Sequence, residues 1–169
     1  MFKSIANYII DGKIRQQSAK IRKTFVEWNF EQLRVVIIGR GQDSEVFRKF
    51  IKENGKKTDV VVFNNDKITQ NADCTLSINK KDLNFLGLPS AEAIEKIKKI
   101  ECDVLINCDL SDELIMKALT GLINAKCKVG RENLSYNKIF DLSIAPSGNS
   151  AMENYLKEAV NYLKMIRTN

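Results

Sequence analysis

The sequence predicts an α/β fold: a Rossmann-like three-layer domain with a mostly parallel sheet, preceded by an N-terminal basic helix. Short apolar runs, such as residues 35–38 and 60–63, are typical of strands that are buried on both faces. Segments with helical periodicity alternate with these runs, which favours βαβ units and a parallel sheet. Right-handed crossovers between such strands place helices on both faces of the sheet.

Residues 2–28 space their apolar side chains as a helix does, with Lys and Arg between them. Gly12 interrupts the pattern, so we expect either one helix or two that break near this residue. The apolar stripe is expected to pack against the rest of the chain or a partner, and a membrane-surface helix is the alternative. The predicted organisation is a basic helical extension over residues 1–33 and a single Rossmann-like α/β domain over residues 34–169.

In the first half of this domain, two buried strands flank one helix. The run at residues 35–38 ends at Gly39, and the helix after it stops at the Asn54–Gly55 pair, a common C-terminal signal. Residues 59–63 form the second strand. A polar loop then leads to a short third strand at residues 75–78.

The second half repeats the alternation and contains recognisable helix starts. Ser90 and Ser111 are placed to cap the helices that follow them. Ser150 and Glu153 form a capping box for the last helix, which we expect to reach about Arg167. The predicted strands of this half are residues 102–108, 126–130 and 139–144, the last with the alternating polarity of a sheet edge.

Composition narrows the chemistry available to the chain. The 169 residues include no histidine, the commonest general base and metal ligand, which excludes zinc sites and Ser–His or Cys–His catalysis. The four cysteines form no CxxC pair, and three of them fall in or beside predicted strands, so we expect buried thiols. No cofactor, metal site or catalytic residue is predicted.

Positive charge is concentrated near the N-terminus. The net charge is +6, and residues 1–34 carry +4 of it, with seven basic against three acidic residues. A basic arm on a nearly neutral body favours an acidic partner, and a solvated helix face is the plainer alternative. Because we find neither a membrane-spanning run nor a signal-peptide core, we expect a cytoplasmic protein.

Three strand ends carry the best candidates for ligand binding, because doubly wound sheets bind ligands beyond the carboxyl ends of their strands. The turn after the first strand has two glycines and Arg40, which could hold a phosphate, although a tight strand-to-helix turn capped by Asp43 or Ser44 is the favoured alternative. Asp109 could bind a hydroxyl, a ribose or a cation, with a turn former beside the helix cap as the favoured alternative. Arg131 could complete an anion site with Arg40 if their loops adjoin. The candidate residues are Gly39, Arg40, Gly41, Gln42, Asp43, Asp109, Ser111 and Arg131.

Most of the chain resembles a family of short uncharacterised bacterial proteins. The segments that carry the resemblance are residues 81–87, 102–107 and 125–131. In that family a basic N-terminal helix precedes a small α/β domain. The resemblance therefore implies a fold and leaves the activity open.

A more distant resemblance is to the N-terminal, acceptor half of heptosyltransferases of the GT-B kind, which is similar to residues 103–107 and 125–130. An early Gly-Asp turn supplies a catalytic aspartate in those enzymes, whereas here Gln42 stands between Gly41 and Asp43. The resemblance implies an acceptor-like half-fold without transferase activity, which is a fold-level analogy.

Three functions remain open on the sequence. One is a non-enzymatic binding or adaptor protein whose basic N-terminal helix docks on RNA, a ribonucleoprotein or an acidic protein partner, through Lys13, Arg15, Lys20, Arg22 and Lys23. The second is a nucleotide- or sugar-phosphate-binding domain related to the glycosyltransferase half-fold. The third is a self-assembly module that uses the apolar side chains Phe85, Leu86 and Leu88.

Overall fold

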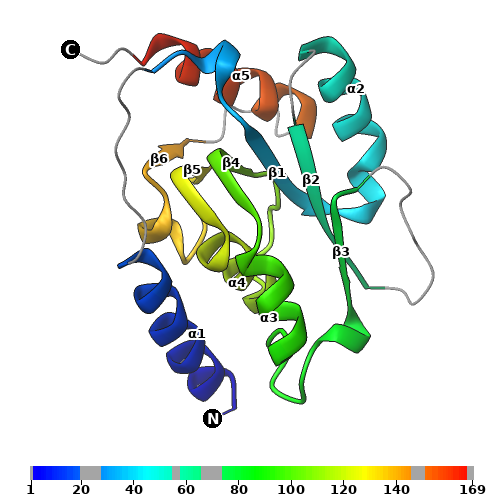
Figure 1. Ribbon diagram of the computed structural model, residues 1–169, viewed down its shortest axis with the longest axis vertical. Coiled ribbons are helices and arrows are strands. Elements are labelled where there is room, and N and C mark those ends of the chain that lie inside the picture. The colour runs from blue at the N-terminus through cyan, green and yellow to red at the C-terminus, as the bar shows by residue number, and fades with distance from the viewer. Residues whose placement is uncertain (1, 20–27, 55–57, 66–73, 146–150, 167–169) are drawn as a thin grey trace.

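A computed structural model describes residues 2–19, 28–54, 58–65, 74–145 and 151–166. In these ranges six strands form one sheet in the order β3-β2-β1-β4-β5-β6, and every neighbouring pair is parallel (Figure 1). The strands are β1 (Val35–Arg40), β2 (Thr58–Asn64), β3 (Leu76–Asn79), β4 (Glu101–Asn107), β5 (Asn124–Arg131) and β6 (Leu142–Ile144). This sheet confirms the predicted α/β fold.

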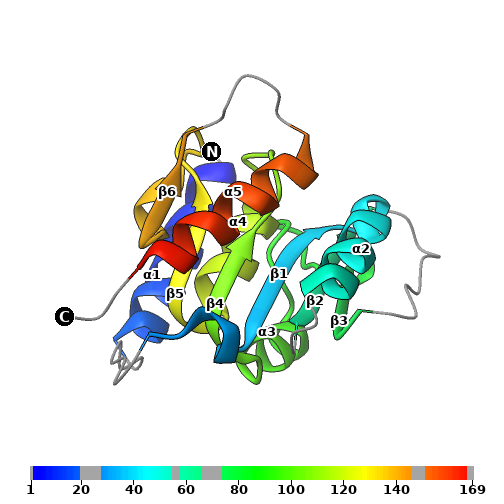
Figure 2. The same cartoon turned by 90° about the horizontal axis from the view of Figure 1, so that it is seen from above.

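Helices cover both faces of the sheet, as Figures 1 and 2 show. One buried cluster joins α2 and α5 to one face of the strands, and a second cluster joins α1, α3 and α4 to the other. The α-helices of the described chain are α1 (Phe2–Ser18), α2 (Ser44–Asn54), α3 (Ala91–Lys98), α4 (Leu114–Leu122) and α5 (Met152–Met165). The result is the three-layer arrangement that the sequence predicts.

Strand β1 lies in the middle of the sheet and explains why its sequence is apolar throughout. Val36 and Ile38 pack in the cluster with α1, α3 and α4, whereas Val35 and Ile37 pack in the cluster with α2 and α5. All four side chains are fully buried. A strand that is covered on both faces needs apolar residues at every position, so the alternation of a half-exposed strand is absent.

The strand order reverses beside β1. From β1 the chain builds outward through β2 to β3, and then returns to place β4 on the opposite side of β1. Helices that follow β1 and β4 therefore leave on opposite faces of the sheet, and the loops at the ends of these strands separate. This reversal creates the opening in which doubly wound folds bind ligands.

Helix α1 packs on the domain that follows it. Ala6, Ile10 and Ile14 are buried, and α1 continues through Gly12 without a break. The Lys117 Nζ atom of α4 lies 2.8 Å from Asp11 Oδ1, which adds an ion pair to the contact. Of the apolar positions that the spacing placed on one stripe, Ile14 is buried and Ile9 is partly buried, whereas Ile5 is 46% exposed, so the buried face of α1 is shifted toward Ala6 and Ile10.

Some boundaries differ from the sequence prediction. Ser90 caps α3 as predicted, because its Oγ accepts a hydrogen bond from the Ala93 backbone N–H. Ser111 does not cap α4, which begins at Leu114, because its hydroxyl is bonded to Asp109 and Arg40 instead. The edge strand is shorter than predicted, since residues 137–139 form a 3₁₀ turn.

The last helix begins later and ends earlier than predicted. Helix α5 starts at Met152, with Ala151 as its N-cap, and it ends at Met165. Ser150 and Arg167 lie outside the described residues. All four cysteines are free thiols; Cys102, Cys108 and Cys127 are buried as expected, whereas Cys74 is half-buried.

Candidate functional site

A wide opening on the described surface lies at the strand reversal. It is a cleft of about 610 Å³ between the ends of β1, β2 and β4. Its lining residues are Arg40, Gly41, Gln42, Phe63, Asn64, Asn65, Asp109, Leu110, Ser111 and Glu113. Five of the eight residues that the sequence nominated therefore meet in one place.

Arg40 is the centre of this cleft. Its Nε atom donates to Asp109 Oδ1 at 2.9 Å, and its Nη2 atom donates to Ser111 Oγ at 2.7 Å. The same Nη2 atom lies 2.9 Å from the Glu113 carboxylate. Two carboxylates therefore share one guanidinium, whose side chain is only 13% exposed.

The guanidinium also lies over an aromatic ring. Its central carbon is 5.3 Å from the centroid of the Phe63 ring, which comes from β2. Burial opposes the charged form of Arg40, but the hydrogen bonds to Asp109 and Glu113 outweigh it and raise the pKa above its usual value. Arg40 thus stays charged and ties the ends of β1, β2 and β4 together.

A second layer of polar groups holds Asp109 in place. The Asn107 side chain is fully buried, and its Oδ1 accepts a hydrogen bond from the Asp109 backbone N–H at 2.8 Å. Its Nδ2 donates to Thr120 Oγ1 at 2.8 Å and to the Tyr136 hydroxyl at 3.2 Å. Because every polar atom of the Asn107 amide is used, the loop after β4 has a fixed shape.

Ser111 completes the floor of the cleft. Asp109 Oδ2 accepts hydrogen bonds from the Ser111 backbone N–H and from its hydroxyl. This arrangement turns the loop back toward Arg40. The groups of the cleft that remain accessible are the Glu113 carboxylate, which is 49% exposed, the amides of Gln42 and Asn65, and the apolar Leu110.

Gly39 and Asp43 do not line the cleft. A Cβ atom at position 39 would lie 2.3 Å from Phe47 Cζ, so packing against α2 explains this glycine. Asp43 ends the 3₁₀ turn that follows β1. Burial raises its pKa above the usual value, the Arg40 backbone N–H lowers it, and the charge of Asp109 raises it further.

Arg131 lies on the other side of the sheet from Arg40. Arg40 alternates along β1 with Val36 and Ile38, which face α3 and α4. Arg131 alternates along β5 with Cys127 and Val129, which face α5. The two arginines therefore do not join in one anion site, although each ends a strand of the same sheet.

Several cleft residues escaped the sequence prediction. Asn64 ends β2 and Asn65 follows it directly, so the strand-end rule that selected Arg40 would have selected them too if it had been applied to this strand. Glu113 precedes α4 and was not among the candidate residues. Only the strand order, which brings β4 next to β1, shows that its carboxylate reaches Arg40.

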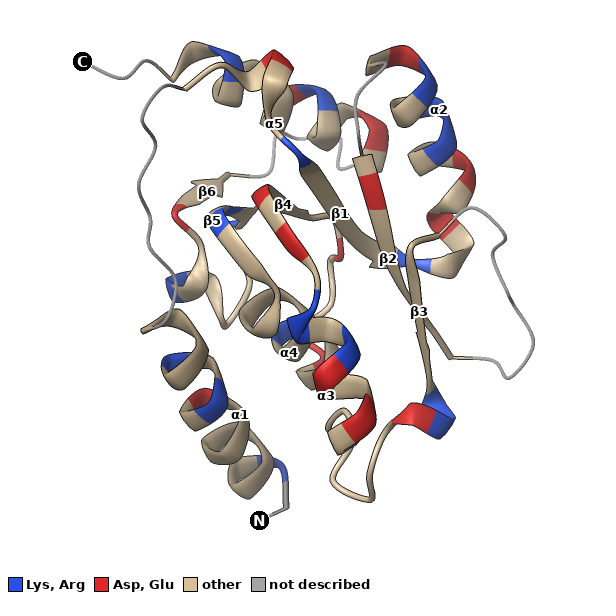
Figure 3. Cartoon of the chain, viewed as in Figure 1, with Lys and Arg blue, Asp and Glu red and all other residues tan. Residues whose placement is uncertain are grey.

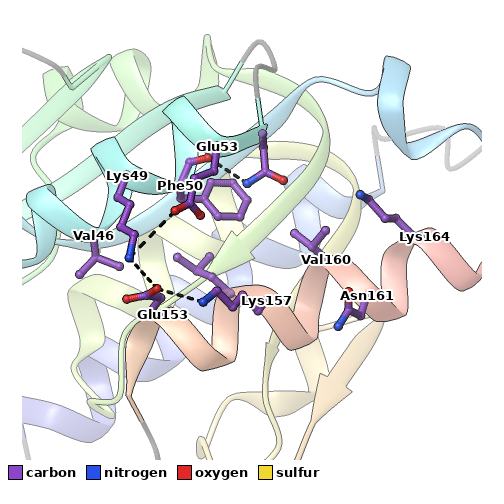
Figure 4. Close-up of a pocket in the computed structure, with 11 residues that line it drawn as sticks. Val46, Lys49, Phe50, Glu53, Glu153, Lys157, Val160, Asn161 and Lys164 are labelled. Carbon is purple, nitrogen blue, oxygen red and sulfur yellow. Dashed lines mark hydrogen bonds and ion pairs between the residues drawn. The ribbon is translucent and has the colours of Figure 1, made fainter.

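A smaller groove of about 220 Å³ lies between α2 and α5. In Figure 4 the side chains of Lys49, Glu153 and Lys157 point toward one another across its mouth. Glu153 Oε1 lies 2.9 Å from Lys49 Nζ and 3.0 Å from Lys157 Nζ. These charges are paired with each other and exposed, and Phe50 and Val160 form an apolar floor, so the groove offers a ligand few polar groups.

A protein-family model described as "Family of unknown function (DUF6913)" matches residues 4–166. The chain belongs to this family. The match spans α1 and the whole sheet, so the N-terminal helix is a part of the family's common unit. No curated protein and no solved structure matches the chain.

Neither a metal-binding cluster nor a membrane-spanning helix occurs among the described residues. Among the residues that the structure describes, no group of three or more Cys, Asp or Glu side chains converges to hold a metal ion. No helix in the described ranges is long and apolar enough to cross a membrane.

Proposed function

We propose that this chain is a binding protein that holds a small hydroxylated ligand, a sugar or a nucleoside, in the cleft between β1 and β4. The observation that carries the proposal is the convergence of three strand ends on polar side chains at the reversal of the sheet. No catalytic step is part of the proposal, since the cleft supplies binding groups and no complete set of reacting groups.

The charges of the cleft favour hydroxyl groups over a phosphate. Asp109 and Glu113 already neutralise Arg40, so no uncompensated cation of the cleft is available to an anion. The accessible carboxylate and amides accept and donate hydrogen bonds in the way that sugar hydroxyls require. The resemblance to the acceptor half of GT-B heptosyltransferases also supports a sugar as the ligand, and it suggests no chemistry beyond that.

The test is a ligand screen with a matched pair of variants. Neutral monosaccharides, disaccharides and nucleosides are titrated into isotopically labelled protein, and amide shifts are followed by NMR. We expect a saturable ligand whose shifts gather on residues 40–42 and 109–113. Glu113→Gln should weaken binding about tenfold, because it replaces a charge-assisted hydrogen bond by a neutral one.

Glu92→Gln on α3 is the control, because Glu92 is an exposed carboxylate away from the cleft. It should leave the affinity unchanged. Shifts that gather elsewhere, or a screen in which no sugar or nucleoside saturates, would rule the cleft out as a site for this ligand class.

A second candidate function is the docking of RNA on α1. The observation that favours it is that α1 buries its apolar face against its own domain and leaves Lys3, Lys13 and Arg15 exposed. Figure 3 shows basic positions along α1 with a single acidic one, whereas both signs mix along α2 and α3. Three of the five nominated contacts, Lys20, Arg22 and Lys23, lie outside the described residues.

The RNA candidate is tested with point variants, because deletion of α1 would uncover buried core. Lys13→Glu with Arg15→Glu should abolish most binding to single-stranded RNA, whereas Lys80→Glu with Lys81→Glu, an equal change of charge at another exposed site, should cost less. The logarithm of the parent's affinity should fall with the logarithm of salt with a slope of roughly −0.7 per phosphate contact. Affinity without salt dependence, or equal losses in both variants, would exclude RNA and leave an acidic protein as the next partner to test.

A further inference from the structure

The last residue of β5 is a buried arginine. Arg131 is 1% exposed and is the largest of the side chains that the fold buries completely. Its backbone is in register with Ile144 of β6, and its side chain faces α5. The central carbon of its guanidinium lies 4.1 Å from the centroid of the Tyr155 ring, which belongs to the first turn of α5.

This guanidinium has no counter-ion in the described part of the chain. Its Nε and Nη2 atoms are buried and have no hydrogen-bond partner, and none of the ion pairs between described residues includes it. An arginine keeps its proton in a protein, so the site holds a full positive charge. Stacking on an aromatic ring offsets only part of the desolvation of a buried cation.

The Cys108 thiol and the Tyr155 phenol, which both interact with Arg131, do not supply the missing negative charge. Burial raises the pKa of the Cys108 thiol far above its usual value, and it raises the pKa of the Tyr155 phenol well above its own. Both groups are therefore neutral at pH 7. The Tyr155 hydroxyl is itself buried without a hydrogen-bond partner, so a second donor accompanies the guanidinium.

The start of α5 adds a third group that favours negative charge. Helix α5 is 14 residues long, and its N-cap, Ala151, makes no side-chain hydrogen bond to the first turn. Helix N-termini favour negative charge because their first N–H groups point outward and the helix dipole is positive there. Tyr155 connects this terminus to Arg131 through the ring contact.

We propose that Arg131, the Tyr155 hydroxyl and the start of α5 form a buried site for a phosphate group, either inorganic phosphate or the phosphate of a small monoester. Buried donors in native proteins are almost always matched by acceptors, and here the Nε and Nη2 donors of Arg131 and the Tyr155 hydroxyl have no partner in the described chain. A phosphate oxyanion supplies both the charge and the acceptors. The planar guanidinium fork fits two of its oxygens.

This site goes beyond the cleft of the proposed function and is independent of it. Arg131 is absent from the lining of that cleft, and it faces α5 while Arg40 faces the layer of α3 and α4. A ligand of one site can therefore be present or absent without the other. Variants of Glu113 test the cleft, and variants of Arg131 test the phosphate site.

The experiment is calorimetric titration of the full chain with inorganic phosphate and with phenyl phosphate, at fixed ionic strength in chloride. We expect one equivalent of phosphate to bind. Arg131→Met should abolish binding. Arg34→Met should keep it, because Arg34 is half-exposed, precedes β1 at the amino ends of the strands and pairs with Asp59. If phenyl phosphate binds and inorganic phosphate does not, the ligand is a monoester.

Two gentler variants decide the matter if Arg131→Met does not fold. Tyr155→Phe removes one hydroxyl and Arg131→Lys keeps the charge without the fork, so each should raise the dissociation constant about tenfold. Phosphate binding that is unchanged in both variants would overturn the proposal. So would an absence of phosphate binding in the parent, which would make Arg131 a core cation held by Tyr155 alone.

Discussion

At the scale of single residues, two arginines that each end a strand have different environments. Arg40 ends β1 and Arg131 ends β5, and each directly follows a glycine. Arg40 has two carboxylates and a hydroxyl as partners, whereas Arg131 lies over an aromatic ring and its Nε and Nη2 atoms have no hydrogen-bond partner in the described chain. The side of the sheet that each residue faces makes the difference, and one residue of register determines that side.

The buried Arg40–Asp109 pair should contribute strongly to stability. Its side chains are 13% and 5% exposed, so Asp109→Ala leaves a desolvated guanidinium with one carboxylate fewer. We expect a loss of about 3–5 kcal/mol in the free energy of unfolding, measured by urea denaturation. The double variant Arg40→Met with Asp109→Leu should recover part of this loss, because it removes the unpaired charge.

The chain offers a matched exposed pair as the control. Arg34 and Asp59 also form an arginine–aspartate ion pair, at 2.7 Å, but their side chains are 49% and 25% exposed. Asp59→Ala should cost about 1 kcal/mol or less, because solvent screens such a pair. Equal losses for the two alanine variants would show that burial does not set the strength of the Arg40 pair.

At the scale of elements, strands that are buried on both faces could be predicted and edge elements could not. β1, β2 and β4 have apolar residues at successive positions, a pattern that requires no knowledge of their neighbours. β6 pairs with another strand on one side only. The alternation of apolar and polar residues that predicted it extends back into residues 137–139, which form a 3₁₀ turn. Its length follows from pairing with β5, which the sequence of β6 does not encode.

The contact between α1 and α4 shows a second limit. Spacing predicted a helix with an apolar stripe, but it gave neither the face of α1 that is buried, which is that of Ala6, Ile10 and Ile14, nor the surface that receives it. A Cβ atom at Gly121 of α4 would lie 2.3 Å from Ile14 Cδ1, so a glycine allows the two helices to approach closely. The sequence shows this glycine only as a weak point in a helix, and its packing role appears when the partner helix is known.

At the scale of the whole molecule, the cleft depends on topology. Arg40 and Asp109 are 69 residues apart, and they meet because β4 returns to the free side of β1. Sequence reasoning could place both residues at strand ends, which explains why five nominated residues line the cleft. It could not derive which strands are neighbours or which face a side chain takes, so Glu113 was missed and Arg131 was joined to the wrong site.

Charge balance across the molecule predicts how stability changes in acid. Hydrogen bonds from Lys49 and Lys157 lower the pKa of Glu153 to about 2, from a usual 4.5. Burial acts to raise the pKa of Asp103, but the Lys126 ammonium and the Arg34 backbone N–H outweigh it and lower the pKa. Carboxylates with lowered pKa values stabilise the folded state above their usual pKa, and that stability is lost as the pH falls toward the folded value.

We therefore expect the urea midpoint to fall between about pH 4.5 and pH 2. The raised pKa of Asp43 works in the opposite direction, because its protonation favours the folded state, so it offsets part of the fall. Glu153→Gln should flatten the profile in this window, whereas Glu92→Gln should leave it unchanged. High salt should also flatten it, because Glu153 and its lysines are exposed. A profile that is the same in Glu153→Gln and in the parent would show that the ion pairs between α2 and α5 play no part in acid stability.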